Sequence, residues 1–203
     1  MSLLLEKGQS LNLTPDGSGL EYVIVGLGWD ELSAEEQIRE SLLLSLEDED
    51  FGLDCDAFAL LLKDGKLTQG MGDVVYYKNL KHKSESVKHM GDNLTGHGKG
   101  DDEQIEIKIK KVPEEYNKII VGMYIWQAKE RKHHLGMLEN SYIRVLNEAN
   151  YNEICKYKFS DDYNGKTALI CGELVRNNKK WSFTTIGKPV IADNFEDILS
   201  LYR

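Results

Sequence analysis

The stretch "QIEIKIK", residues 104–110, alternates polar and apolar side chains along its whole length. Ile105, Ile107 and Ile109 occupy every second position, and both residues between them, Glu106 and Lys108, are charged. Successive side chains of an extended chain point to opposite faces, so the three isoleucines share one face. The stretch therefore predicts a half-buried β-strand with one face on a core and one in water.

The same pattern recurs on both sides of this stretch. Further strands are expected at 10–14, 22–27, 57–62, 74–78, 119–126, 141–146, 154–159, 167–175 and 181–186. Turn sequences such as "TPDGSG", "KDGK" and "SDDYNG" separate them. Many short strands joined by such turns favour an all-β fold, a two-sheet β-sandwich.

Two segments have helical spacing instead. Residues 33–46 begin with Ser33 and Glu36, which together form a capping box, and continue with leucines at helical intervals. The tail "NFEDILSLY" begins with Asn194, a preferred N-cap residue, and predicts a C-terminal helix. We expect both helices to be short additions to the sandwich.

Length and composition suit a single cytoplasmic domain, residues 1–203. The chain is 41% hydrophobic and 29% charged, and its apolar runs are too short to cross a bilayer. The start "MSLLLEKGQS" does not resemble a signal peptide. Cys55, Cys155 and Cys171 are widely spaced, which predicts free buried thiols in a reducing compartment.

Negative charge is concentrated in one region. The formal net charge is −9, and residues 29–56 carry eleven acids but only one base, Arg39. Nonspecific nucleic-acid binding needs clustered Lys and Arg, so this distribution argues against a nucleic-acid partner and against unaided binding or insertion at anionic membranes.

Three acidic stretches adjoin predicted strands. "GLGWD" ends at Asp30, "DCDAFALLL" begins with Asp54 and Asp56, and the glycine-rich "GDNLTGHGKGDDEQ" (91–104) precedes the strand quoted first. Loops of a sandwich gather at the ends of its sheets, so these carboxylates can meet at one end. Ca²⁺ takes six to eight oxygen ligands, although no EF-hand pattern is present. A solvated acidic loop is the alternative.

Several blocks carry a family resemblance. They are "GLGWD" (26–30), "DCDAFALLL" (54–62), "YYKNL" (76–80), "HMGDNLTGHGKGDDEQI" (89–105), "NSYIRVLN" (140–147), "KYKFSDD" (156–162) and "GELVRNNKKWSFTTIG" (172–187). Together they resemble the TerD domain of tellurium-resistance and stress-response proteins. That resemblance implies a Ca²⁺-binding β-sandwich from bacterial stress operons with no known enzymatic reaction. Some relatives are described as cyclic-nucleotide-binding proteins, which leaves a small-anion ligand as an alternative.

The resemblance also implies the ligands of two neighbouring Ca²⁺ ions. They are Asp30, Asp54, Asp56, Asp92, Asn93, Asp101, Asp102 and Glu103. His97 and Lys99 stand where the family usually has acids. A lysine inside a cation site is unfavourable, so we expect Lys99 to point outward or to lower occupancy. Residues 31–50 exceed the usual family length and are interpreted as a helical insertion.

Other chemistry receives less support from the residues. The histidines are expected on the surface or in turns, and a metal-dependent hydrolase built on His89 is a minor alternative because no HExxH motif exists. Thiol chemistry on tellurite would need a thiol of lowered pKa, and no nearby residue supplies one. The basic stretch "WQAKERKHH" (126–134) is expected to be a solvated loop.

These observations predict a calcium-binding, non-enzymatic scaffold or interaction module. Ca²⁺ would neutralise the loop carboxylates and fix the loops in one shape. Other stress-response proteins, on a membrane-associated complex, are the expected partners. A domain that bridges Ca²⁺ to lipid phosphate is a third option, and the acidic segments offer few apolar or basic loop tips for it.

Overall fold

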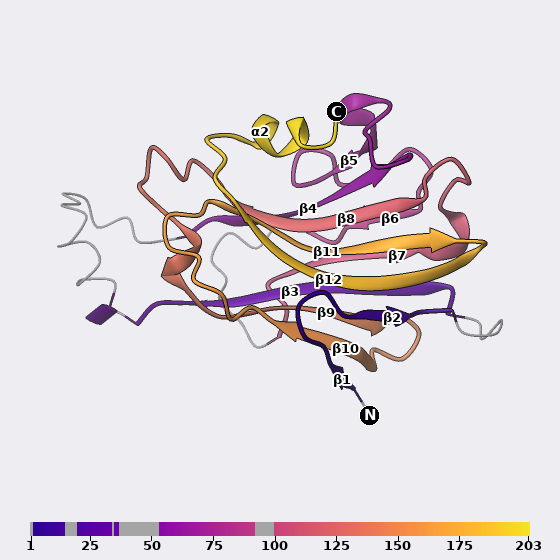
Figure 1. The fold of residues 1–203 in the computed structure, drawn as a ribbon, viewed down its shortest axis with the longest axis horizontal. Coiled ribbons are helices and arrows are strands. Elements are labelled where there is room, and N and C mark those ends of the chain that lie inside the picture. Colours follow the sequence, from indigo (N-terminus) through magenta and orange to yellow (C-terminus); the bar gives the residue numbers. More distant parts are fainter. Residues whose placement is uncertain (1, 15–19, 34, 37–52, 92–99) are drawn as a thin grey trace.

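The computed structural model describes residues 2–14, 20–33, 35–36, 53–91 and 100–203. Within these residues the strands form two six-stranded sheets that pack face to face (Figure 1). The first sheet, sheet A, has the order β1 (Leu3–Leu4), β10 (Glu153–Lys158), β9 (Leu138–Asn147), β3 (Tyr22–Glu31), β7 (Glu103–Lys108), β6 (Val87–His89). The second, sheet B, has the order β2 (Ser10–Asn12), β12 (Lys180–Val190), β11 (Ala168–Asn177), β8 (Lys118–Ile125), β4 (Cys55–Leu62), β5 (Val74–Val75). The predicted two-sheet sandwich is confirmed.

Most of the stretch "QIEIKIK" (104–110) lies in β7 and shows the predicted alternation. Ile105 and Ile107 are fully buried between the sheets, whereas Gln104, Glu106 and Lys108 lie partly exposed on the other face. The strand ends at Lys108, because a 3-10 turn, η3 (Ile109–Lys111), follows it. All the pairings are antiparallel except that of β1 with β10, which is parallel.

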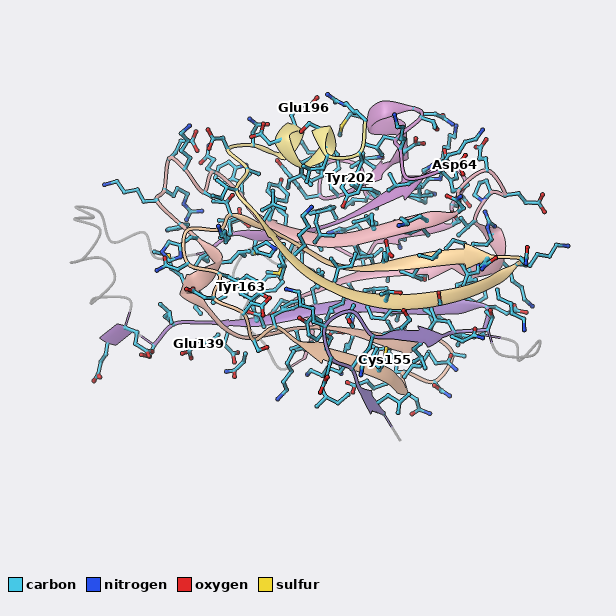
Figure 2. All side chains as sticks on the ribbon, viewed as in Figure 1. Asp64, Glu139, Cys155, Tyr163, Glu196 and Tyr202 are labelled. Atoms are coloured by element: carbon cyan, nitrogen blue, oxygen red, sulfur yellow. The ribbon has the colours of Figure 1, made fainter. Side chains whose placement is uncertain are left out.

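Side chains from both sheets fill the space between them (Figure 2). In β3 the inward residues are Val23, Val25, Leu27 and Trp29, which all belong to this core. The large apolar area removed from water supplies the main favourable contribution to folding.

A second apolar cluster lies on the outer face of sheet B, under the C-terminal helix α2 (Phe195–Ser200). A capping box between Asn194 and Asp197 starts the helix, as the sequence predicts. Phe195 contacts the rings of Phe58, Tyr76 and Tyr124. Because β4 is covered on both faces, all eight of its residues are buried.

Strand direction brings three acidic segments to one end of the sandwich. β3 ends there, and β4 and β7 begin there, because β3 pairs antiparallel with β7 and β4 pairs antiparallel with β8. We call this end, with Asp30, Asp54, Asp56 and residues 101–103, the acidic pole. The other 3-10 turns are η2 (Gly70–Asp73) and η4 (Leu135–Met137).

Little of the predicted 33–46 helix falls within the described residues. The Ser33 hydroxyl oxygen accepts from the Glu36 amide at 3.4 Å, and the Glu36 carboxylate accepts from the Ser33 amide at 3.2 Å, so the capping box is present. Residues 37–46, and most of the 31–50 insertion, lie outside the described part. Among the described helices none is long and apolar enough to cross a membrane.

Candidate functional site

Two glycines of β3 make the outer face of sheet A flat at the acidic pole. A Cβ atom at Gly26 would lie 2.1 Å from the nearest atom of the Asp101 carboxylate, and one at Gly28 would lie 2.3 Å from the Tyr142 ring. Real Cβ atoms do not approach that closely. The "GLG" of "GLGWD" is therefore explained by two side chains that lie directly on the backbone.

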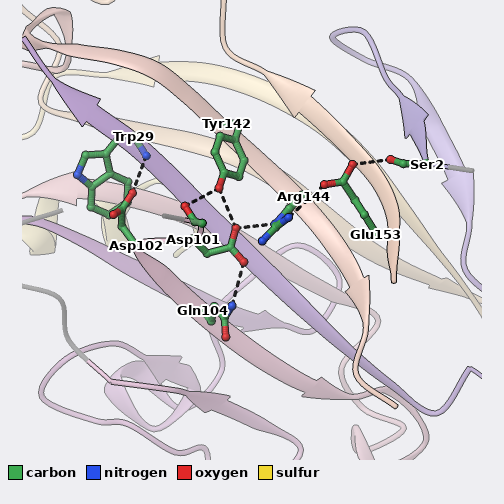
Figure 3. A network of polar contacts seen from close by, with 9 residues as sticks. Ser2, Trp29, Asp101, Asp102, Gln104, Tyr142, Arg144 and Glu153 are labelled. Carbon is green, nitrogen blue, oxygen red and sulfur yellow. Dashed lines mark hydrogen bonds and ion pairs between the residues drawn. The ribbon is translucent and has the colours of Figure 1, made fainter. Parts of the chain in front are cut away.

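Asp101 lies on Gly26 and is held by three donors (Figure 3). Arg144 Nε donates to Asp101 Oδ1 at 2.6 Å, and the Tyr142 hydroxyl donates to the same oxygen at 3.1 Å. Gln104 Nε2 donates to Oδ2 at 2.9 Å. The Asp101 side chain is 0% exposed. A buried, ion-paired carboxylate with both oxygens engaged is stable as it stands.

Asp102 is in a different electrostatic situation. Its Oδ2 atom accepts a hydrogen bond from the Trp29 amide at 2.7 Å. The pKa of Asp102 is raised from its usual 3.8 to about 6, mainly by burial and also by the neighbouring charges of Asp30, Asp101 and Glu103, against the lowering effect of the Trp29 bond. At neutral pH Asp102 is therefore ionised, although its surroundings disfavour the charged form.

Glu103 points into the sandwich. Its Oε2 atom accepts from the Ala57 amide of β4 and lies 3.3 Å from His89 Nε2. The Gly91 amide donates to His89 Nδ1 at 3.3 Å, so in the neutral imidazole the proton is assigned to Nε2, facing Glu103. Both side chains are fully buried. Glu103 thus joins sheet A to sheet B at the acidic pole.

Asp30 is exposed at the end of β3, next to a β-bulge between Gly28 and Asp30. Asn140 Nδ2 donates to Asp30 Oδ2 at 2.8 Å. Asp30 also pairs across the ladder with Glu139, an exposed acid that sequence reasoning did not single out. Like charges directly opposite one another on adjacent strands repel.

Asp54 and Asp56 flank the buried thiol of Cys55. Burial raises the pKa of Cys55 well above its usual value, and Glu103, Asp56 and Asp54 raise it further. Asp56 is only 3% exposed and interacts with the Tyr124 hydroxyl under α2. Burial raises the pKa of Tyr124, and the charge of Asp56 raises it further. The carbonyl of Asp54 accepts from the Trp126 amide at 2.8 Å. All three carboxylates therefore act on one thiol.

The sequence pattern that defines the TerD domain matches residues 1–202. The chain belongs to the TerD domain family. This TerD domain is 40% identical over 202 residues to "Stress response protein SCP2" of Bacillus subtilis (strain 168), with all of both chains covered. It is 38% identical over 188 residues to "Tellurium resistance protein TerD" of Serratia marcescens, which covers 93% of this chain and 91% of that one.

A solved structure has the same fold. The homologue of telluride resistance protein (TerD) from Streptomyces coelicolor A3(2) superposes with a TM-score of 0.61 over 91% of this chain and 97% of that chain. Its sequence is 19% identical, so the likeness concerns the fold alone. The family predicted from the sequence blocks is confirmed.

The predicted ligands of this TerD domain are only partly assembled by the described residues. Asp30, Asp101 and Glu103 each lie close enough to Asp102 to contribute to its raised pKa. Their oxygen chemistry suits Ca²⁺. Within the described ranges, however, no three acids, histidines or cysteines meet closely enough to hold a metal ion. Asp92, Asn93, His97 and Lys99 lie outside the described residues.

Several partners in this TerD domain were not predicted. Arg144, Tyr142 and Gln104 hold Asp101, and nothing in the sequence links Arg144 and Tyr142 to an acid about 40 positions earlier. The histidines were expected on the surface or in turns, but His82, His89 and His133 are buried. His89 shares the buried face of β6 with Val87, and this alternation of buried and exposed positions could have suggested its burial.

The thiol prediction agrees with the structure of this TerD domain. All three cysteines are free and buried. Burial raises the pKa of Cys171 well above its usual value and that of Cys155 to about 12. Since the thiolate is the reactive form, these side chains are poor nucleophiles in the folded protein.

Proposed function

We propose that this TerD domain binds Ca²⁺ at the acidic pole and serves as a non-enzymatic interaction module of a bacterial, cytoplasmic stress response. The single observation that carries the proposal is Asp102: a partly buried carboxylate, disfavoured in its ionised form by burial and by three acidic neighbours. A bound cation would remove that electrostatic penalty.

The proposed ligands include described residues of the acidic pole and residues known from the sequence alone. From the described residues they are Asp30, Asp54, Asp102 and Glu103, and the sequence adds Asp92 and Asn93. Ca²⁺ prefers such hard oxygen donors and accepts irregular geometry. Asp56 interacts with Tyr124, and Asp101 is paired with Arg144, so neither is needed to hold the ion.

The proposed partners are other stress-response proteins, including those of a membrane-associated complex. Relatives are named for stress response and for tellurium resistance, which supports a role in such responses. Ca²⁺ would cancel the repulsion within the pole and fix its surface for a partner protein. A small anion is a weaker candidate ligand, because it would meet the negative pole and because Lys129 of the basic stretch is paired with Asp193.

Ca²⁺ titration by isothermal calorimetry, with thermal melts in Ca²⁺ and in EDTA, tests the proposal. At about a hundredfold excess over Kd, the ion should stabilise the fold by about 2.7 kcal/mol. Asp102→Asn should abolish that increment. Glu114→Gln, an exposed acid at the opposite end, is the matched control and should keep it. No heat of binding together with identical wild-type melts would refute Ca²⁺ binding.

A further inference from the structure

We propose that Asp101 is a positioning residue rather than a metal ligand: with Arg144 it anchors the start of β7 to the outer face of sheet A. The inference rests on the proposed function only for its Ca²⁺ readout. It assigns different roles to adjacent acids, because Asp101 is neutralised by the protein itself and Asp102 is not.

The first argument is that both carboxylate oxygens of Asp101 already accept hydrogen bonds. Oδ1 accepts from Arg144 and Tyr142, Oδ2 accepts from Gln104, and the side chain is completely buried. The single proton of the Tyr142 hydroxyl is shared between Oδ1 and the carbonyl of Gly100, which lies 2.7 Å from the hydroxyl oxygen, so Tyr142 also holds the backbone before Asp101. To bind a metal, Asp101 would have to leave a charged partner behind in a partly buried site, which is costly.

The second argument is the shape of the surface under Asp101. The carboxylate lies where the Cβ of any other residue at position 26 would be. Gly26 does not have a positive φ, so its backbone conformation does not require glycine. The glycine is instead explained by the space that Asp101 occupies, which indicates a fixed, close-packed position for this carboxylate.

The anchor continues to the N-terminal strand, as Figure 3 shows. Arg144 Nη1 donates to Glu153 Oε2 at 3.3 Å, and the Ser2 hydroxyl donates to Glu153 Oε1 at 2.5 Å. Although burial opposes the shift, these hydrogen bonds lower the pKa of Glu153. A chain of polar contacts therefore runs from Asp101, just before β7, to Arg144 on β9 and Glu153 on β10. It ends at Ser2, the residue before β1.

The decisive experiment compares Asp101→Asn with Asp102→Asn, two neighbours with the same change of charge. In EDTA, Asp101→Asn should lower Tm by about 4–8 °C, because Arg144 loses a buried partner. It should keep a Ca²⁺-dependent rise in Tm and the wild-type number of ions per chain by calorimetry. Asp102→Asn should do the opposite, with no fall in Tm in EDTA and no rise with Ca²⁺.

Arg144→Gln should reproduce the Asp101→Asn result, and the double variant should lose much less than the two single losses added together. Additive losses would overturn the anchor, as would an unchanged Tm of Asp101→Asn in EDTA. Loss of one ion per chain in Asp101→Asn would make Asp101 a ligand. If wild-type protein takes up no Ca²⁺, the proposed function fails, and the EDTA melts still decide the anchor.

A second test addresses the close packing of Asp101 on Gly26. Gly26→Ala should lower Tm in EDTA because the new methyl group displaces the Asp101 carboxylate. Combining it with Asp101→Ala should give no further loss than Asp101→Ala alone, since the atoms in conflict are then absent. Gly72→Ala is the control, because a Cβ there meets Gln69 at an ordinary 3.5 Å. A Gly26→Ala loss that adds in full to that of Asp101→Ala would contradict the close packing.

Discussion

Asp101, Asp102 and Glu103 follow one another at the acidic pole but have three different surroundings. Asp101 is ion-paired with Arg144, Asp102 is only partly buried and has a raised pKa, and Glu103 accepts from the Ala57 amide of the other sheet. Strict alternation would place Asp101 and Glu103 on one face, yet Asp101 lies outside sheet A and Glu103 points inward. β7 begins only at Glu103, and Gly100 has a φ of +122°, so alternation does not apply before the strand.

Asp102 gives the protein a pH dependence of definite sign. The folded state raises its pKa from 3.8 to about 6, so folding favours the protonated form. Its contribution to stability is fully present below about pH 4 and is lost as the pH rises through about 6. In EDTA at pH 7.5, Asp102→Asn should therefore stabilise the fold by about 1–2 kcal/mol after allowance for solvent screening.

Thermal melts of wild type and Asp102→Asn between pH 4 and pH 8 measure this difference. We expect the two curves to converge near pH 4, since both side chains are then neutral. Glu114→Gln should give a flat difference across the range. Equal stability at pH 7.5, or a difference that grows toward low pH, would show that Asp102 is not under the proposed electrostatic penalty.

At the scale of elements, strands with clear alternation were predictable and short edge strands were not. β1 has two residues and β6 has three, which is too few for a periodic pattern. β4 reads as an apolar run, and the sequence does not show that its second face is covered by α2. The C-terminal helix was predictable because its cap and its stripe are local signals.

α2 stabilises sheet B through Phe195. Removal of its ring by Phe195→Ala deletes contacts with Phe58, Tyr76 and Tyr124, and should cost about 2–3 kcal/mol in the free energy of unfolding measured in urea. Leu201→Ala, at an exposed position after the helix, should cost less than about 0.5 kcal/mol. Equal effects of the two changes would mean that the helix is not held by its aromatic contact.

The whole molecule encloses its three thiols in one core. Cys55, Cys155 and Cys171 lie on β4, β10 and β11, all inside the core between the sheets. Carboxylates line one pole, where they act on Cys55 but leave it protonated. The closed sandwich therefore shields all three thiols from solvent.

The thiols should therefore react only when the protein unfolds. With Ellman's reagent at pH 8, we expect native protein to react at least about a hundredfold more slowly than protein in 6 M guanidinium, because exchange with an unfolded state of low population limits the reaction. Destabilisation by Phe195→Ala should speed the reaction in proportion to the unfolded population. If even one thiol per chain reacted fast in the native protein, that cysteine would be accessible to the reagent. Thiol chemistry would then again be a candidate function. That outcome would require a local opening of the sandwich, since burial raises the pKa of each thiol in the closed fold.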